Sequence, residues 1–365
     1  TLTLTRNRMP RWLSEGISVY EEEERNSAWG QRMSVGYRDR ILSGRMQKIS
    51  EMSAAFLSAQ SGEDTQFASF QSYLVVKFLF ENYGIEAMRA LLRDLGEGVT
   101  MNEALANRVA PLNELNERFL ADARLQAKAL GGAYALTKPE GMLQESIELV
   151  TPGKNYFKEM DSVQPLVEVE DWKAASDKLE EIISESGYIP GEENAHGLLG
   201  YVYEQLGEVE KERAILEAIA ANEAHRLDPI ERLLTIALGQ DDPPNVVKWA
   251  NAWIAINPMA IEPWRALFAT HARFQYQSPA IAAGNTLLTL DPPEIAKVHY
   301  TLALQYLRSD PQTARRHTLM ALEEAPRFRS AYELLEEIIQ EQEETEKESS
   351  NPASVSTPKL DGISF

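Results

Sequence analysis

WANAWIAINP at 249–258, NTLLTLDP at 285–292 and TLMALEEAP at 318–326 are the segments that decide the fold of this chain. Each is an apolar run with the composition of a helix that stops at a proline, and the three prolines stand 34 residues apart. Proline cannot continue a helix, so a helix is expected to end at each of them. A helix end that recurs at a fixed distance predicts a repeated helical unit.

Counting outward from these prolines gives four units, which begin at Glu193, Leu227, Ile261 and Ile295. A leucine falls at the seventh or eighth position of every unit, namely Leu199, Leu233, Leu234, Leu267 and Leu302. The first unit also has Gly200 at the small-residue position where two helices are expected to cross closely. An irregular helical bundle with chance spacing is the alternative to a repeat array.

The 34-residue units resemble tetratricopeptide (TPR) repeats, which implies an all-α fold that contains a TPR-like α-solenoid. We place the repeats at 166–342, with 171–186 as the second helix of a divergent earlier unit and 329–342 as a capping helix. Residues 1–136 form a separate helical region, and the proline- and glycine-containing stretch 137–165 is expected to be a linker. The acidic, Ser- and Pro-rich segment 343–365 is expected to be disordered.

Composition excludes several classes of function. The net charge of −20 argues against binding to nucleic acid, and the absence of cysteine excludes disulfides and thiolate chemistry. No apolar run is long enough to span a membrane.

Within 1–136, helices are expected at 10–24, at 68–83 up to Gly84, at 86–95 and at 112–130.

The segment MPRWLSEGISVYEEEE at 9–24 resembles the glutamate-bearing helix of gluzincin, or peptidase-MA-like, zinc metallopeptidases. That helix typically follows the pattern P-x-W-[LV]-x-E-G-x-[AS]-x-[YF]. The matching positions here are Pro10, Trp12, Leu13, Glu15, Gly16, Ser18 and Tyr20. The segment from Ser53 to Leu92 resembles, more loosely, the helical subdomain that follows in these families.

The resemblance implies that Glu15 is the third zinc ligand, beside two histidines from an HExxH helix whose glutamate activates water for peptide hydrolysis. The chain contains no HExxH, and its five histidines all lie in the repeats. We therefore expect the chain to be the C-terminal part of a truncated metallopeptidase-like protein. Zinc is expected in the intact parent and not in this fragment, which should be inactive by itself.

Simpler interpretations stand beside this one. Glu15 could be a solvated acid near a helix N-terminus, where the helix dipole favours negative charge. Glu21 to Glu24 are interpreted as a solvated helix face. Tyr73 and Tyr83 could be proposed as oxyanion donors, but they are interpreted as core aromatics.

The first helix of each repeat is expected to line a concave face that binds a protein or a peptide. The residues assigned to this partner-binding face are Tyr201, Glu204, Arg265, Arg273, His299 and Tyr306. The alternative function is a non-catalytic TPR scaffold or adaptor. By the same resemblance, a periplasmic or secreted location in a bacterium is favoured over a cytoplasmic one.

Overall fold

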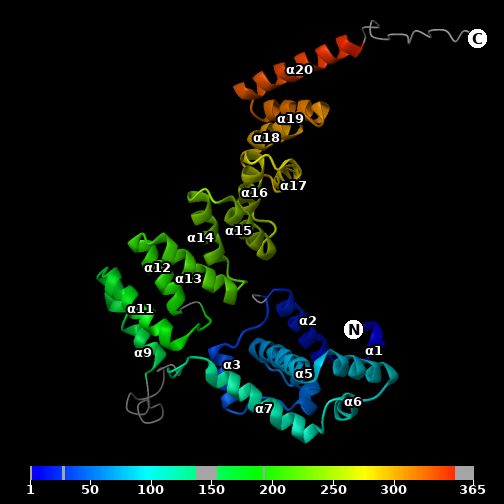
Figure 1. The fold of residues 1–365 in the computed structure, drawn as a ribbon, viewed down its shortest axis with the longest axis vertical. Helices are drawn as coiled ribbons and strands as arrows, with labels where there is room; N and C mark the ends of the chain where they lie inside the picture. The colour runs from blue at the N-terminus through cyan, green and yellow to red at the C-terminus, as the bar shows by residue number, and fades with distance from the viewer. Residues whose placement is uncertain (1, 27–28, 137–153, 192–193, 350–365) are drawn as a thin grey trace, which may run out of the picture. The chain divides into compact units, whose positions relative to one another are not determined.

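The computed structural model describes residues 2–26, 29–136, 154–191 and 194–349, and the chain forms two compact units, Thr1–Leu233 and Leu234–Phe365 (Figure 1). Within the described ranges every regular element is a helix, which confirms the all-α prediction. None of these helices is both long enough and apolar enough to cross a bilayer.

The first part of unit 1 is built around one long helix, α5. Its elements are α1 (Leu2–Thr5), α2 (Arg11–Arg25), α3 (Val35–Leu42), the 3₁₀ turn η1 (Ile49–Glu51), α4 (Met52–Ala55), α5 (Gly62–Glu97), α6 (Met101–Arg108) and α7 (Leu112–Ala129). Helices α1, α2, α4, α6 and α7 pack against α5. The predicted break at Gly84 is confirmed, because its φ of 76° and ψ of 175° interrupt α5 where only glycine is unstrained.

The second part of unit 1 corrects the predicted linker. Residues 137–153 lie outside the described residues, but 154–165 are not an extended connection. They hold α9 (Tyr156–Asp161) and the start of α10 (Gln164–Glu168), which pack on α11 (Trp172–Ser186). Helices α12 (Ala195–Leu206) and α13 (Val209–Asn222) follow. Reasoning from sequence missed α9 because it is short and lies between prolines and glycines.

A tight seam joins the two parts of unit 1. The Ala135 N–H donates to the carbonyl of Lys154 at 2.9 Å, and the Tyr156 N–H donates to the carbonyl of Ala135 at 3.0 Å. A Cβ on Gly132, whose φ is +53°, would lie 2.1 Å from the carbonyl oxygen of Glu185 in α11. The seam therefore depends on glycine at this position.

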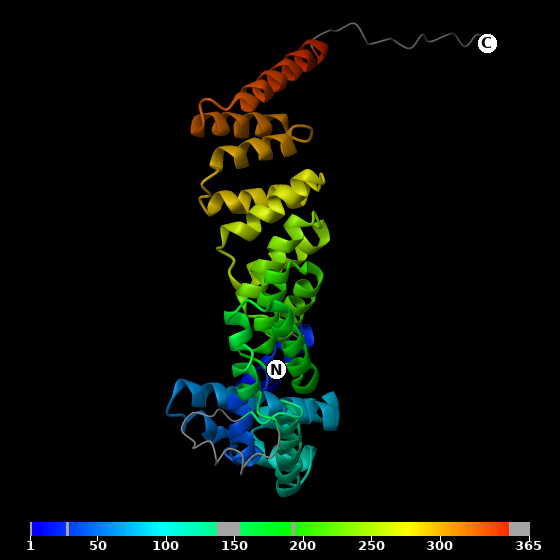
Figure 2. The same ribbon diagram turned by 90° about the vertical axis from the view of Figure 1, so that its left-hand side faces the viewer.

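The later helices confirm the predicted period. They are α14 (Leu227–Gly239), α15 (Pro243–Ile256), α16 (Ile261–Arg273), α17 (Gln277–Thr289), α18 (Ile295–Tyr306), α19 (Pro311–Glu324) and α20 (Arg329–Ser349). Within unit 2, α15 to α20 stack in chain order (Figure 2). Left-handed residues recur 34 residues apart in the turn between the two helices of a pair, at Gly207, Asp241 and Gln275.

Two expectations about the repeats need correction. A Cβ on Gly200 would meet its nearest atom, Cδ2 of Leu216, at 3.6 Å, which is ordinary contact. The close approach lies at Gly284 instead, where a Cβ would meet Phe268 at 2.7 Å and Leu302 at 2.8 Å. Helix α20 continues to Ser349, beyond the predicted end at 342, so the first part of the expected disordered tail is helical. Residues 350–365 lie outside the described residues.

Candidate functional site

Helix α2, which carries the peptidase-like motif, is seated directly on α5. Pro10 precedes its first residue, where a missing N–H and a fixed φ suit a helix start. Trp12 and Leu13 are buried, being 1% and 0% exposed. A Cβ on Gly16 would lie 2.4 Å from the carbonyl oxygen of Ser72 in α5, so the two helices touch backbone to backbone at this glycine. The motif positions Trp12, Leu13 and Gly16 thus form the face that packs on α5.

Glu15 lies on a different face of α2. Its side chain is 42% exposed and pairs with Arg11, whose Nε lies 3.5 Å from a Glu15 carboxylate oxygen. The Arg11 guanidinium also lies over the ring of Phe56, 4.6 Å from its centroid. The packing of α2 therefore leaves the Glu15 carboxylate partly exposed to solvent.

The residues that the structure describes do not by themselves form a zinc site. Structural and catalytic zinc sites need three or four protein ligands. No three His, Asp or Glu side chains among the described residues are grouped so that they could hold a metal ion. Glu15 is a single carboxylate already paired with an arginine, and the histidines all lie at or beyond residue 196.

Glu23 corrects the interpretation of the acidic run at 21–24. Its side chain is only 13% exposed and lies against α5. The hydroxyl of Tyr73 donates to Glu23 at 2.6 Å, and the ammonium of Lys77 donates to the same carboxylate at 2.9 Å. Burial and the bond to Glu23 raise the pKa of Tyr73 to about 12. Glu21, Glu22 and Glu24 are all exposed, so Glu23 is the residue that departs from the predicted solvated face.

The two tyrosines considered as oxyanion donors are both engaged. Tyr73 is 4% exposed, and its hydroxyl is bound to Glu23. The hydroxyl of Tyr83 accepts from Arg118 at 2.8 Å, and its ring packs edge-on against Phe78. Their interpretation as packing residues agrees with these contacts.

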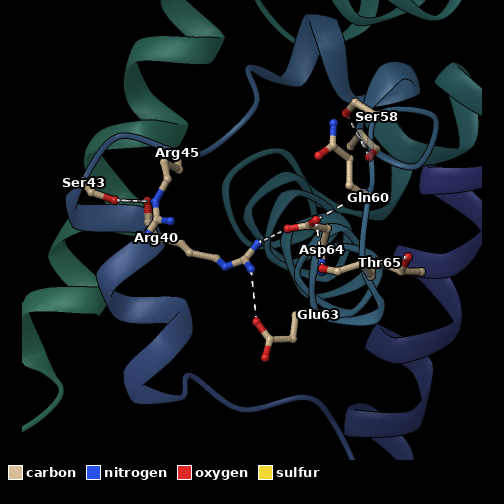
Figure 3. A network of polar contacts seen from close by, with 10 residues as sticks. Arg40, Ser43, Arg45, Ser58, Gln60, Glu63, Asp64 and Thr65 are labelled. Carbon is tan, nitrogen blue, oxygen red and sulfur yellow. Dashed lines mark hydrogen bonds and ion pairs between the residues drawn. The ribbon is translucent and has the colours of Figure 1, made fainter. Parts of the chain in front are cut away.

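A second polar network fixes the start of α5 against α3 (Figure 3). Arg40 donates to Asp64 at 2.7 Å, and the same carboxylate accepts from the hydroxyl of Ser61 and the backbone N–H of Gln60. These donors, Arg40 first, lower the pKa of Asp64 to about 2. A polar hollow of about 180 Å³ lies beside the network. Because Arg40 of α3 pairs with both Glu63 and Asp64 at the start of α5, the network acts as a structural clamp between these two helices.

The predicted partner-binding residues of unit 1 are Tyr201 and Glu204, both exposed on α12. The ring of Tyr201 packs edge-on against Trp172 of α11, with centroids 5.9 Å apart. Glu204 lies 3.3 Å from Arg232, which also donates two bonds to the buried Glu212. The buried Glu212 therefore holds Arg232 beside Glu204.

Arg265 and Arg273 of unit 2 are both held by carboxylates. Arg265 donates two bonds to Glu294, one of them at 3.0 Å, and Arg273 donates two bonds to Asp241, one of them at 2.9 Å. The carboxylate partners raise the pKa of each guanidinium. Two parallel bonds fix a guanidinium plane as well as its position. No sequence pattern signalled these partners, which lie 29 and 32 residues away along the chain.

A hollow of about 150 Å³ adjoins Arg273 in unit 2. It lies between the end of α14, the start of α15 and the end of α16, and two exposed apolar side chains, Leu238 and Phe274, line it. The Arg273 guanidinium lies over the Phe274 ring, 5.3 Å from its centroid. The hollow has about the volume of a single apolar side chain.

His299 and Tyr306 are less available than predicted. Nδ1 of His299 lies 2.8 Å from Nδ1 of His317 in α19, and the Tyr306 ring stacks on the His317 ring at 5.6 Å. Both side chains are half-buried. His317, which sequence reasoning did not single out, is the residue that brings them together.

The first third of the chain matches a known family. Residues 2–121 match the family model of the peptidase MA superfamily. This range contains the whole of α2 and its seven motif positions. The chain therefore combines a peptidase-MA-like region with helical repeats. No curated protein matches the chain.

Solved structures that the chain is similar to include TPR proteins. YrrB, described as a TPR protein with an unusual peptide-binding site, is 15% identical with a TM-score of 0.37, covering 52% of this chain and 95% of its own. A MamA fragment from Desulfovibrio magneticus RS-1 is 17% identical with a TM-score of 0.34, covering 46% and 93%. TTC0263, a thermophilic TPR protein from Thermus thermophilus, is 16% identical with a TM-score of 0.27, covering 51% and 99%.

Proposed function

We propose that this protein binds a polypeptide partner through the first helices of its repeats, beside a peptidase-MA-like region. The observation that carries the proposal is the way Arg265 and Arg273 are held. Each presents a guanidinium whose plane is fixed by a carboxylate before any partner arrives, and fixed donors lose little conformational freedom on binding. The hollow beside Arg273 adds an apolar contact of side-chain size.

A charge-swap series tests this role without dismantling the ion pairs. Arg265→Glu combined with Glu294→Arg reverses the local charges while keeping a carboxylate next to a guanidinium, and Arg273→Asp combined with Asp241→Arg does the same. Partners that crosslink to the wild-type protein should be lost from both swapped proteins, while the helical circular dichroism stays unchanged. Retention of the same partners at the same affinity by both swaps would remove the proposal.

Peptide hydrolysis is a second proposed function, and it is favoured by one observation. The family match covers α2, and the packing of Trp12, Leu13 and Gly16 on α5 leaves Glu15 on an accessible face. In a protein that also carries an HExxH helix, Glu15 would supply the carboxylate of a zinc site. Because Glu15 is the one zinc ligand proposed among the present residues, the proposal concerns a longer protein that carries both elements.

The gene region upstream of Thr1 provides the first test, because an encoded HExxH shortly before this residue is required. The second test measures zinc per protein in the longer product by mass spectrometry of the metal. Glu15→Gln should lose most of the zinc, whereas Glu22→Gln, two helical turns farther along α2, should keep it. Absence of HExxH, or equal zinc in both variants, favours the alternative function of a non-catalytic scaffold.

A further inference from the structure

One close pair of ionisable groups has no part in the ion pairs that carry the proposed function, namely His299 of α18 and His317 of α19. Their Nδ1 atoms lie 2.8 Å apart, and the ring centroids are separated by 5.1 Å. His317 is 6% exposed. At hydrogen-bond distance one Nδ1 must carry a hydrogen and the other must accept it, because two bare nitrogens or two N–H groups would repel.

A shared hydrogen explains the close contact between these two rings better than a bound metal ion does. Throughout the part of the chain that the structure describes, no third His, Asp or Glu side chain joins the two rings in a group that could hold a metal. Two ligands alone are fewer than protein zinc sites use. The pair is therefore best understood as two imidazoles that share one hydrogen.

The bond tolerates one added proton but not two. The donating ring can be protonated on its Nε2 and still donate from Nδ1. The accepting ring cannot be protonated on Nδ1 without losing the bond. With both rings protonated, two N–H groups face each other across a buried contact and two positive charges lie side by side.

The surroundings oppose that doubly charged state. Burial, then the charges of His299 and Arg316, lower the pKa of His317 to about 4. Burial also lowers the pKa of His299, and only Glu324 of α19 acts in the opposite direction. Among the described residues of α17 and α20, which pack on these two helices, no charged group acts on either ring.

We propose that His299 and His317 form a latch that joins α18 to α19 at neutral pH and is released by acid. Imidazoles of the unfolded chain take up a proton below about pH 6.5, whereas the buried rings of the folded protein stay neutral to lower pH. The latch therefore contributes its full stability above about pH 6.5. Its contribution declines as the pH falls toward 4. Release frees the rings of His299 and Tyr306, so acid alters the surface of this repeat. The inference does not depend on the identity or existence of a bound partner.

Hydrogen exchange of the full chain, followed by mass spectrometry at pH 7.5 and 4.5 and corrected for intrinsic rates, tests the latch. Peptides from α18 and α19 should lose protection by at least about tenfold at pH 4.5, while peptides from α16 and α17 change less. In the double variant His299→Leu, His317→Leu the loss should disappear. The control His225→Leu, at a histidine outside the pair, should behave as the wild type.

Nitrogen-15 spectra of the wild-type imidazoles keep the proposal testable if the double variant fails to fold. They should show one ring of the pair as the Nδ1–H tautomer and a titration displaced below pH 6.5. Two Nε2–H rings that titrate near pH 6.5, or equal protection of α18 and α19 at both pH values, would overturn the latch.

Discussion

Replacing Gly16 by alanine is the sharpest test of how α2 is seated. The added Cβ would lie 2.4 Å from the carbonyl oxygen of Ser72 and 2.7 Å from Cγ2 of Val76. Real Cβ contacts below 3.0 Å are essentially absent. Because the Ser72 oxygen belongs to the backbone of α5, no side-chain rotation can relieve the contact. Helix α2 must therefore move away by roughly 0.6 Å or more in a close-packed interior.

Two opposing effects set how much Gly16→Ala changes the free energy of opening at the contact between α2 and α5. Overpacking of a well-filled core costs about 1–3 kcal/mol. Alanine is a better helix former than glycine and returns up to about 1 kcal/mol. The two ranges together leave a loss of about 0–3 kcal/mol, centred on about 1–2 kcal/mol, in the free energy of opening at the contact between α2 and α5.

The matched control is Gly200→Ala, also inside a helix. There the new Cβ would meet Leu216 at 3.6 Å, which is ordinary contact, so only the gain in helix propensity remains. Hydrogen exchange in native conditions should show faster opening of α2 and α5 in the first variant and slower opening of α12 in the second. If Gly16→Ala leaves α2 as protected as in the wild type, the proposed backbone contact is wrong.

Three further predictions concern other contacts. Glu23→Gln should lower the pKa of Tyr73 from about 12, because the bond to this carboxylate adds to the effect of burial, and tyrosinate absorbance measured against Tyr73→Phe checks it. The pKa of Asp64 is lowered to about 2, so its clamp stabilises the fold fully above about pH 4 and is lost toward pH 2. Hydrogen exchange at the start of α5 should therefore become faster between about pH 4 and pH 2, and this pH dependence should be absent in Asp64→Asn. Gly132→Ala should loosen the seam, because its Cβ would lie 2.1 Å from the oxygen of Glu185, and equal protection of α11 in variant and wild type would contradict this.

Much of the fold was predictable from local pattern. The prolines at 258, 292 and 326 and the break at Gly84 act within their own segments, and the helices end or break as these residues require. The short helix α9 and the extension of α20 to Ser349 were missed. Helix α9 carries a weak local signal and is supported by its contacts with α10 and α11. The Glu-rich residues 343–349 instead continue α20 through their own helix propensity.

The sequence alone determined the 34-residue period, the helical class and the motif of α2, because each depends on residues a few positions apart along one helix. Only the tertiary structure decided what each side chain meets. It pairs Glu15 with Arg11, turns Glu23 inward to Tyr73 and sets His299 against His317. Such contacts depend on the distance between helices and on their rotation about their axes. Neither the distance nor the rotation can be deduced from the spacing of residues within a single helix.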